Sequence, residues 1–220
     1  MTQLLLIRHA TNDSLKADKL TGWTPGVTLN EEGLAQARTL VTRLEGVPIA
    51  AIYSSPLERA VQTAQPLAQA RGLEIQARAG LGEVHIGDWT GRSISELIQT
   101  DTWRQFQVQP SLTRFPNGES GQEMQARAVA ELDAICTAHP GDTVAIFSHA
   151  DVIKAIVAYY AGLHMDHFQR LVVSPASISV VWAGPSGSRL VRLNDTGRLD
   201  DLIPPQLPPI VQDPDAKEQG

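Results

Sequence analysis

The chain has 220 residues, of which 42% are hydrophobic, so it suits one medium-sized domain and is not globally disordered. Its 18 basic and 24 acidic residues give a net charge of −6, which argues against a nucleic-acid-binding protein, because such proteins carry a basic surface. With one cysteine, no signal-peptide pattern and no long apolar run, we expect a cytoplasmic protein with no internal disulfide and no membrane partner.

The first half of the chain alternates short apolar runs with helical patterns. A buried strand at 4–7 ends in Arg8 and His9, and a second strand at 49–53 runs into Ser54. Asn30 is the expected N-cap of a helix at 31–44. Ser55 is the expected cap of a helix at 57–70, with Pro56 in its first turn.

The second half continues this alternation. It predicts a strand at 73–75, a glycine-rich loop at 80–91, a short helix from Ser93 and a less regular stretch at 101–116. A helix at 119–138, a strand at 143–147 and a helix at 151–161 are expected next. The last predicted element is an antiparallel hairpin of 178–182 with 189–193. Strands alternating with helices indicate an α/β sandwich with a mostly parallel sheet and an antiparallel edge strand. Residues 200–220 are rich in proline and predict an extended tail.

Four charged or titratable side chains sit where strands meet helices. Arg8, His9 and His149 each follow a predicted strand, and Arg59 lies in the first turn of a helix. Because parallel strands end at one edge of a sheet, these four can converge. Two arginines and two histidines in one pocket of an acidic protein require an anion, and the guanidinium fork favours a phosphoryl group.

Four short motifs, in order, carry a resemblance to a known family. The sequences are Arg8-His9-Ala10, residues 54–64, residues 81–91 around Glu83, and Ser148-His149. Together they resemble the histidine phosphatase superfamily, the phosphoglycerate mutase-like proteins, over about residues 3–195. The resemblance implies a three-layer α/β/α sandwich, with residues 1–199 as one domain and a small cap at about 93–120.

The resemblance also implies residue roles. His9 is the expected nucleophile and forms a phosphohistidine, while Glu83 is the expected general acid and then base. Arg8, Arg59 and His149 are expected to neutralise the phosphoryl oxygens, with no metal and no cofactor. The expected substrate-binding residues are Arg8, Thr11, Asn12, Thr21, Gly22, Arg59, His149 and Ala150.

The chain departs from the family pattern near its first motif. Ala10 replaces a glycine, and Leu15 stands where mutase-like members usually carry asparagine, so Thr11 or Asn12 would have to replace that donor. On the other side, Thr21-Gly22-Trp23 resembles the substrate loop of phosphoglycerate mutases.

Three functions follow from these features. The first is a metal-independent phosphomonoesterase, a hydrolase, which is favoured because only 65 residues separate Glu83 from His149 and leave room for a small cap. The alternative is cofactor-dependent phosphoglycerate mutase-type transfer, an isomerase activity, and the third is a non-catalytic phosphate-binding protein. The expected partner is a small-molecule phosphate ester, with a homodimer as a further possibility.

The stretch 102–118 is the expected specificity segment. It carries Trp103, Phe106 and Phe115, and its arginines Arg104 and Arg114 are candidates to bind a second anionic group of the substrate. Substitutions such as Phe115→Ala or Arg114→Ala are therefore expected to re-rank a panel of phosphate esters.

Overall fold

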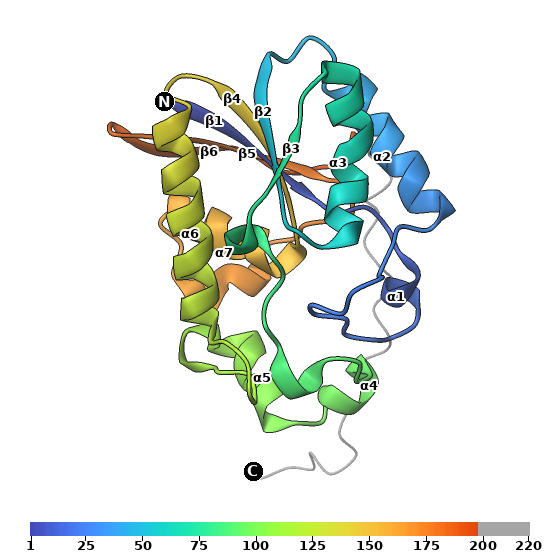
Figure 1. Ribbon diagram of the computed structural model, residues 1–220. Coiled ribbons are helices and arrows are strands. Elements are labelled where there is room, and N and C mark those ends of the chain that lie inside the picture. Colours follow the sequence, from blue (N-terminus) through green and yellow to red (C-terminus); the bar gives the residue numbers. More distant parts are fainter. Residues whose placement is uncertain (198–220) are drawn as a thin grey trace, which may run out of the picture.

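The computed structural model describes residues 1–197, apart from the side chains of Leu15 and Lys16 (Figure 1). The predicted tail at 200–220 lies outside the described residues. The strands are β1 (Thr2–Arg8), β2 (Ile49–Ser54), β3 (Ile75–Ala77), β4 (Thr143–Ser148), β5 (Ile178–Gly184) and β6 (Gly187–Asp195). The α-helices are α1 (Asp13–Lys16), α2 (Glu31–Arg43), α3 (Glu58–Arg71), α4 (Ile94–Leu97), α5 (Asp101–Val108), α6 (Gly121–Ala138) and α7 (Ala150–Tyr160). Short 3-10 helices are η1 (Ala79–Leu81), η2 (Gly87–Trp89), η3 (Pro110–Leu112) and η4 (Met165–Arg170).

The strands form one sheet in the order β3-β2-β4-β1-β5-β6. The first four strands run parallel to one another, β5 is antiparallel to β1, and β6 is antiparallel to β5. Helices α2 and α3 cover one face, and α6 and α7 cover the other (Figure 1). The predicted three-layer sandwich, mostly parallel with an antiparallel edge, is confirmed. No helix among residues 1–197 has the length and apolar character to cross a bilayer.

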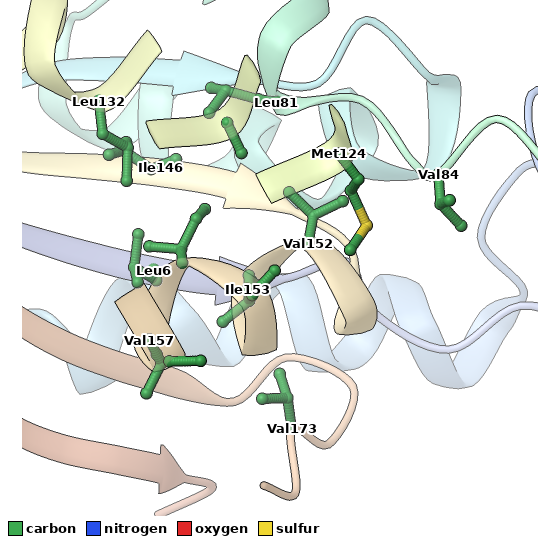
Figure 2. Packing of buried hydrophobic residues seen from close by; sticks show 14 of the residues in the cluster. Leu6, Leu81, Val84, Met124, Leu132, Ile146, Val152, Ile153, Val157 and Val173 are labelled. Carbon is green, nitrogen blue, oxygen red and sulfur yellow. The ribbon is translucent and has the colours of Figure 1, made fainter. Parts of the chain in front are cut away.

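Alternate residues of the central strands supply two separate cores. In β1, Leu4 and Leu6 pack with α6 and α7, whereas Leu5 and Ile7 pack with α2 and α3. All four are at most 3% exposed, and burying each side chain contributes about 1.5–3 kcal/mol. Figure 2 shows part of the first core, in which Leu6 and Ile146 lie near Leu132 of α6 and Val152, Ile153 and Val157 of α7. The rigid sheet therefore fixes where its strand ends lie.

The carboxyl ends of β1 and β4 lie where the chain leaves the sheet toward opposite faces. From β1 the chain goes on to α2 on one face, and from the neighbouring β4 it goes on to α7 on the other face. In such sheets, ligands bind in the crevice where the two connections diverge. Asn30 caps α2 as expected, accepting from the Gly33 N–H at 2.9 Å. A Cβ on Gly33 would lie 2.0 Å from the Thr11 carbonyl oxygen, so glycine permits α2 to pack against the loop that follows His9.

The expected start of the helix after β2 is wrong. Ser55 continues the strand ladder, because its N–H donates to the Phe147 carbonyl at 2.8 Å. Helix α3 begins only at Glu58, after Leu57, so Pro56 lies outside the helix and Ser55 is not its cap. The third strand also lies two residues later than expected, at Ile75–Ala77. Because Ser55 does not cap α3, its hydroxyl is available for a hydrogen bond at the site described below.

The segment 93–120 contains α4, α5 and η3 and lies beyond the carboxyl ends of the parallel strands (Figure 1). Its aromatic residues are packed rather than free. Phe115 is 2% exposed, and its ring lies 5.1 Å from Trp89 and 4.7 Å from Phe106, centroid to centroid. Phe115 is therefore a core residue.

Phe115→Ala should lower the free energy of unfolding by about 3–5 kcal/mol, because it removes a buried ring and leaves a cavity. Urea denaturation followed by circular dichroism measures this. Leu112→Ala is the matched control, since Leu112 lies in the same segment but is 69% exposed, and it should change stability by less than about 0.5 kcal/mol. Equal effects of the two substitutions would contradict this packing.

Candidate active site

The ends of β1 and β4 bring two histidines together. Arg8 pairs with Ser148 in the parallel ladder, and the next N–H, that of His9, donates to the Ser148 carbonyl at 2.9 Å. The rings of His9 and His149 then lie 5.2 Å apart, centroid to centroid, tilted by 56°. Both side chains are buried, with 3% and 0% exposure. The expected convergence of the two strand ends is therefore present in the structure.

His9 is held as a neutral imidazole. Its Nδ1 lies 2.8 Å from the Ala10 carbonyl oxygen, which can only accept, so Nδ1 carries the proton. Burial, followed by the nearby Arg59 and Arg8 charges, lowers the pKa of His9 to about 3. The remaining nitrogen, Nε2, keeps its lone pair at neutral pH, as a nucleophile requires.

His149 is held by the Ser55 hydroxyl. Nε2 of His149 lies 2.8 Å from Ser55 Oγ, and Ser55 Oγ accepts from the Leu57 N–H at 3.3 Å. Burial first, and then Arg59, lowers the pKa of His149 well below its usual value, so this ring is also neutral. If Ser55 donates to Nε2, the proton of His149 sits on Nδ1, which lies 3.5 Å from Glu83 Oε2. That tautomer presents an N–H donor beside the carboxyl group.

Two arginines are anchored by backbone carbonyls. Arg8 Nη1 donates to Val173 O at 2.7 Å, and Arg59 Nη2 donates to Gly22 O at 2.9 Å. Burial lowers the pKa of both guanidinium groups, but arginine remains a cation in proteins. Among the described residues, Arg8 Nε, Arg59 Nη1 and His149 Nδ1 are buried nitrogens without a hydrogen-bond partner in the protein.

The residues that carry these nitrogens all lie near His9: Arg8 and Arg59 line the same cavity, and the His149 ring lies 5.2 Å from the His9 ring. An unsatisfied buried polar group costs about 1–3 kcal/mol. A tetrahedral oxyanion such as a phosphoryl group offers several acceptors and a negative charge, so it can satisfy N–H donors from different directions. Their presence around His9 fits an anion-binding site.

Glu83 lies beside His149, with its Oε2 3.5 Å from His149 Nδ1. Its Oε1 accepts from the Val84 N–H at 3.0 Å, and its Oε2 lies 4.0 Å from Arg59 Nη2. Burial raises the pKa of Glu83, and the Arg59 charge partly opposes this increase. With 19% of its side chain exposed, the carboxyl group lies in a largely dry position that favours its protonated form relative to a carboxyl group in water.

A cavity of about 330 Å³ opens from this cluster. Of the residues expected from the sequence, it is lined by Arg8, His9, Asn12, Thr21, Gly22, Arg59, Glu83 and Ala150. His149, which was expected to line the pocket, is not among the lining residues, but it lies against His9 and Glu83. Thr11 faces elsewhere, because its N–H and its hydroxyl both donate to Gln36 Oε1 at 3.0 Å. The side chain of Leu15 lies outside what the structure describes.

The arginines of the specificity segment are not where they were expected. Neither Arg104 nor Arg114 lines the cavity. Arg104 pairs with Asp101 at 2.8 Å, and Arg114 pairs with Glu123 at 2.5 Å, both in exposed positions. The expectation that these two arginines bind a second anionic group is therefore wrong, because neighbouring carboxylates turn both toward the surface.

Thr63 connects the loop after β1, which carries His9, with helix α3, which carries Arg59. It was not singled out from the sequence. Its Oγ1 accepts from the Ala10 N–H at 2.9 Å and donates to the Arg59 carbonyl at 2.6 Å. Ala10 in turn holds the His9 ring. The only sequence signal is its position four residues after Arg59 on the same helix face.

Arg127 holds the loop that carries Glu83. From α6, its guanidinium donates to the carbonyls of Gly80, Gly82 and Glu83, each at 2.9 Å. It also forms a two-pronged ion pair with Glu119, at 2.9 and 2.6 Å. The Trp23 indole N–H donates to the Glu83 carbonyl as well, at 2.5 Å. Arg127 lies within an ordinary helical pattern, so nothing in the sequence indicates this contact.

Arg127→Lys should reduce kcat/KM for an alkyl phosphate by about 10- to 100-fold, because a single ammonium cannot replace the fork and the Glu83 carboxyl shifts. p-Nitrophenyl phosphate, whose leaving group needs no proton, should be affected much less. On a Glu83→Gln background the substitution should have little further effect.

Arg114→Lys is the matched control, since Arg114, like Arg127, pairs with a carboxylate, that of Glu123, but is exposed and lies outside the cavity. This variant should leave kcat/KM for both esters unchanged. The contradicting result is an equal loss of kcat/KM for both esters after Arg127→Lys, with an effect that adds to that of Glu83→Gln. That result would show that Arg127 supports the fold without positioning Glu83.

Comparisons with known proteins identify the family of the chain. The family model described as histidine phosphatase superfamily (branch 1) matches residues 4–196. Phosphoserine phosphatase 1 of Hydrogenobacter thermophilus is 28% identical over 92% of this chain and 96% of its own length. A probable phosphoglycerate mutase, GpmB of Escherichia coli, is 31% identical over 82% of this chain and 85% of its own.

A solved structure shows the same fold. A mutant phosphoserine phosphatase from Entamoeba histolytica, in complex with phosphoserine, superposes with a TM-score of 0.81 at 25% identity, over 89% of this chain and 98% of that chain. These matches support an enzyme of the phosphatase or mutase type, with hydrolysis supported. The chain belongs to the histidine phosphatase superfamily.

Proposed function

We propose that the protein is a metal-independent phosphatase that hydrolyses phosphate monoesters through a phosphohistidine on His9. The observation that carries the proposal is the state of His9: a buried, neutral ring with its Nδ1 proton committed to Ala10 and two guanidinium groups beside it. The phosphatase relative supports the same reaction class.

In the first step, Nε2 of His9 attacks the phosphorus and the ester P–O bond breaks. Glu83, protonated, gives its proton to the departing alkoxide. Arg8, Arg59 and the His149 N–H stabilise the charge on the phosphoryl oxygens, with guanidinium forks suited to that geometry.

In the second step, water attacks the phosphohistidine. Glu83, now a carboxylate, takes the proton of that water, the P–N bond breaks and inorganic phosphate leaves. His9 returns to its neutral form. The two steps use the same carboxyl group in opposite protonation states, which suits a pKa that burial raises above the usual value of a glutamate.

The remaining site residues fit positioning roles. Asn12, Thr21, Gly22 and Ala150 line the cavity next to the cluster and are candidates for substrate contact. Thr11, committed to Gln36, is better suited to holding the loop. The segment 93–120 is proposed as the cap, because Trp103, Phe106 and Phe115 line the cavity from that side.

Phosphate release from p-nitrophenyl phosphate in the presence of EDTA tests this proposal. We expect turnover at an undiminished rate. The alternative, mutase-type transfer, is favoured by the relationship to GpmB and by Thr21 and Gly22 in the lining. It predicts formation of 2-phosphoglycerate from 3-phosphoglycerate primed with 2,3-bisphosphoglycerate, without net phosphate release. That outcome, without ester hydrolysis, would replace the phosphatase proposal.

A further inference from the structure

Away from the phosphoryl end, the cavity wall is mainly apolar. Its side chains there include Leu20, Ile86, Trp89, Ile94, Trp103 and Phe106. The volume of about 330 Å³ lies near the lower limit of the roughly 300–1,000 Å³ typical of small-molecule sites. The cavity therefore has room for an organic group of moderate size beside a phosphoryl group.

This wall is rigid. Trp89 and Phe106 are 3% and 4% exposed and belong to the main core. Trp89 lies 5.8 Å from Trp103, and Phe106 lies 5.6 Å from Phe168, centroid to centroid. Rings fixed by such packing offer a preformed apolar surface, which binds apolar groups without an added ordering cost.

The charges around the wall do not favour a second anion. Among the described lining residues, the only cation besides Arg8 and Arg59 is Lys19, which is exposed. Asp151 also lines the cavity, and its carboxylate, 3.3 Å from Lys154 Nζ, is close enough to Glu83 to raise that residue's pKa. A carboxylate on the substrate would find neither a further guanidinium nor a buried ammonium among the described lining residues, and it would lie near the Asp151 carboxylate, whose charge is already paired with Lys154.

From the apolar wall and these charges, we infer that the site takes phosphate monoesters of uncharged, apolar alcohols and disfavours esters that carry a second anionic group. The inference rests on the proposed phosphatase function. It separates this chain from its phosphoserine phosphatase relative, whose named substrate carries a carboxylate. It also argues against phosphoglycerate as the preferred substrate.

Two esters of equal chain length test the inference on the 220-residue protein: n-hexyl phosphate and 6-phosphonooxyhexanoate. Their alcohols have nearly equal acidity, so a difference in kcat/KM reports recognition of the distal end and not chemistry. We expect hexyl phosphate to be preferred by about 10-fold or more, as is usual for a mismatch in an apolar pocket. Equal values, or a preference for the carboxylate ester, would overturn the inference.

A cation placed in the wall gives a second test. Ile94→Lys should raise kcat/KM for the carboxylate ester relative to hexyl phosphate by about 10-fold. Ile98→Lys is the matched control, since Ile98 follows the same short helix but is 42% exposed and does not line the cavity. It should leave the ratio unchanged. Equal ratios in the two variants, both folded by circular dichroism, would show that this wall does not contact the leaving group.

p-Nitrophenyl phosphate separates the inference from the function on which it rests. Turnover of this ester with no preference between the hexyl pair refutes the apolar selection alone. Absence of phosphate release from every ester refutes the phosphatase proposal and the inference together.

Discussion

Replacing His9 with alanine should reduce phosphate release from every ester by about 10⁴- to 10⁶-fold, the loss typical of removing a covalent nucleophile. Nε2 of His9 is unprotonated, because the ring carries its proton on Nδ1, which donates to the Ala10 carbonyl, and because burial and the nearby arginines lower the pKa of the ring to about 3. Arg8, Arg59 and His149 would remain, but they stabilise charge and cannot form the phosphohistidine. Steady-state release of inorganic phosphate measures the loss.

His164→Ala is the control for this experiment. Its side chain is 66% exposed and lies outside the cavity lining, so the variant should retain full activity. Circular dichroism should show both variants folded, since alanine at position 9 leaves the backbone ladder to Ser148 intact. Residual turnover of His9→Ala within about 10-fold of the unmodified protein would mean that the nucleophile is another group or a water molecule.

Glu83→Gln should reduce kcat/KM for an alkyl phosphate by about 10²- to 10⁴-fold, the usual contribution of a positioned general acid. For p-nitrophenyl phosphate the loss of kcat/KM should be less than about 10-fold, because p-nitrophenolate leaves without a proton. Hydrolysis of the phosphohistidine still needs a base, so kcat should fall for both esters. A burst of p-nitrophenolate is then expected in the variant.

The same substitution should change the pH dependence. With the unmodified protein, kcat/KM for alkyl esters should fall as the pH rises through the raised pKa of Glu83, because the acid loses its proton. Toward low pH, activity should persist until His9 becomes protonated, near pH 3. Glu83→Gln should remove the high-pH decline and keep the low-pH one. Equal loss of kcat/KM on both esters, with an unaltered pH profile, would contradict an acid role for Glu83.

The sequence predicted the parts of this architecture that depend on local pattern. Apolar runs at 4–7 and 143–147 place β1 and β4, and the residues that follow them, His9 and His149, meet because neighbouring parallel strands end together. The hairpin of β5 and β6 and the cap Asn30 likewise follow from periodicity and local hydrogen bonding.

What the sequence could not predict depends on contacts between distant segments. Arg127 reaches the Glu83 loop only after α6 packs beside it, across 44 residues of chain. Ser55 resembles a helix cap locally, but the ladder to β4 extends the strand and directs its hydroxyl to His149. Arg104 and Arg114 are candidates for substrate contact from their place in the variable segment, but nearby carboxylates on the surface bind them instead.

The phosphohistidine itself can be observed by rapid mixing with a ³²P-labelled ester, quenching in base and mapping the labelled peptide by mass spectrometry. Glu83→Gln is the preferred protein, because it should slow hydrolysis of the intermediate after the nitrophenolate has left. The result expected is a base-stable, acid-labile phosphoryl group on His9 that forms within the burst and is absent from His9→Ala. Turnover with no phosphorylated enzyme at any time, or with the label on another residue, would contradict covalent catalysis by His9.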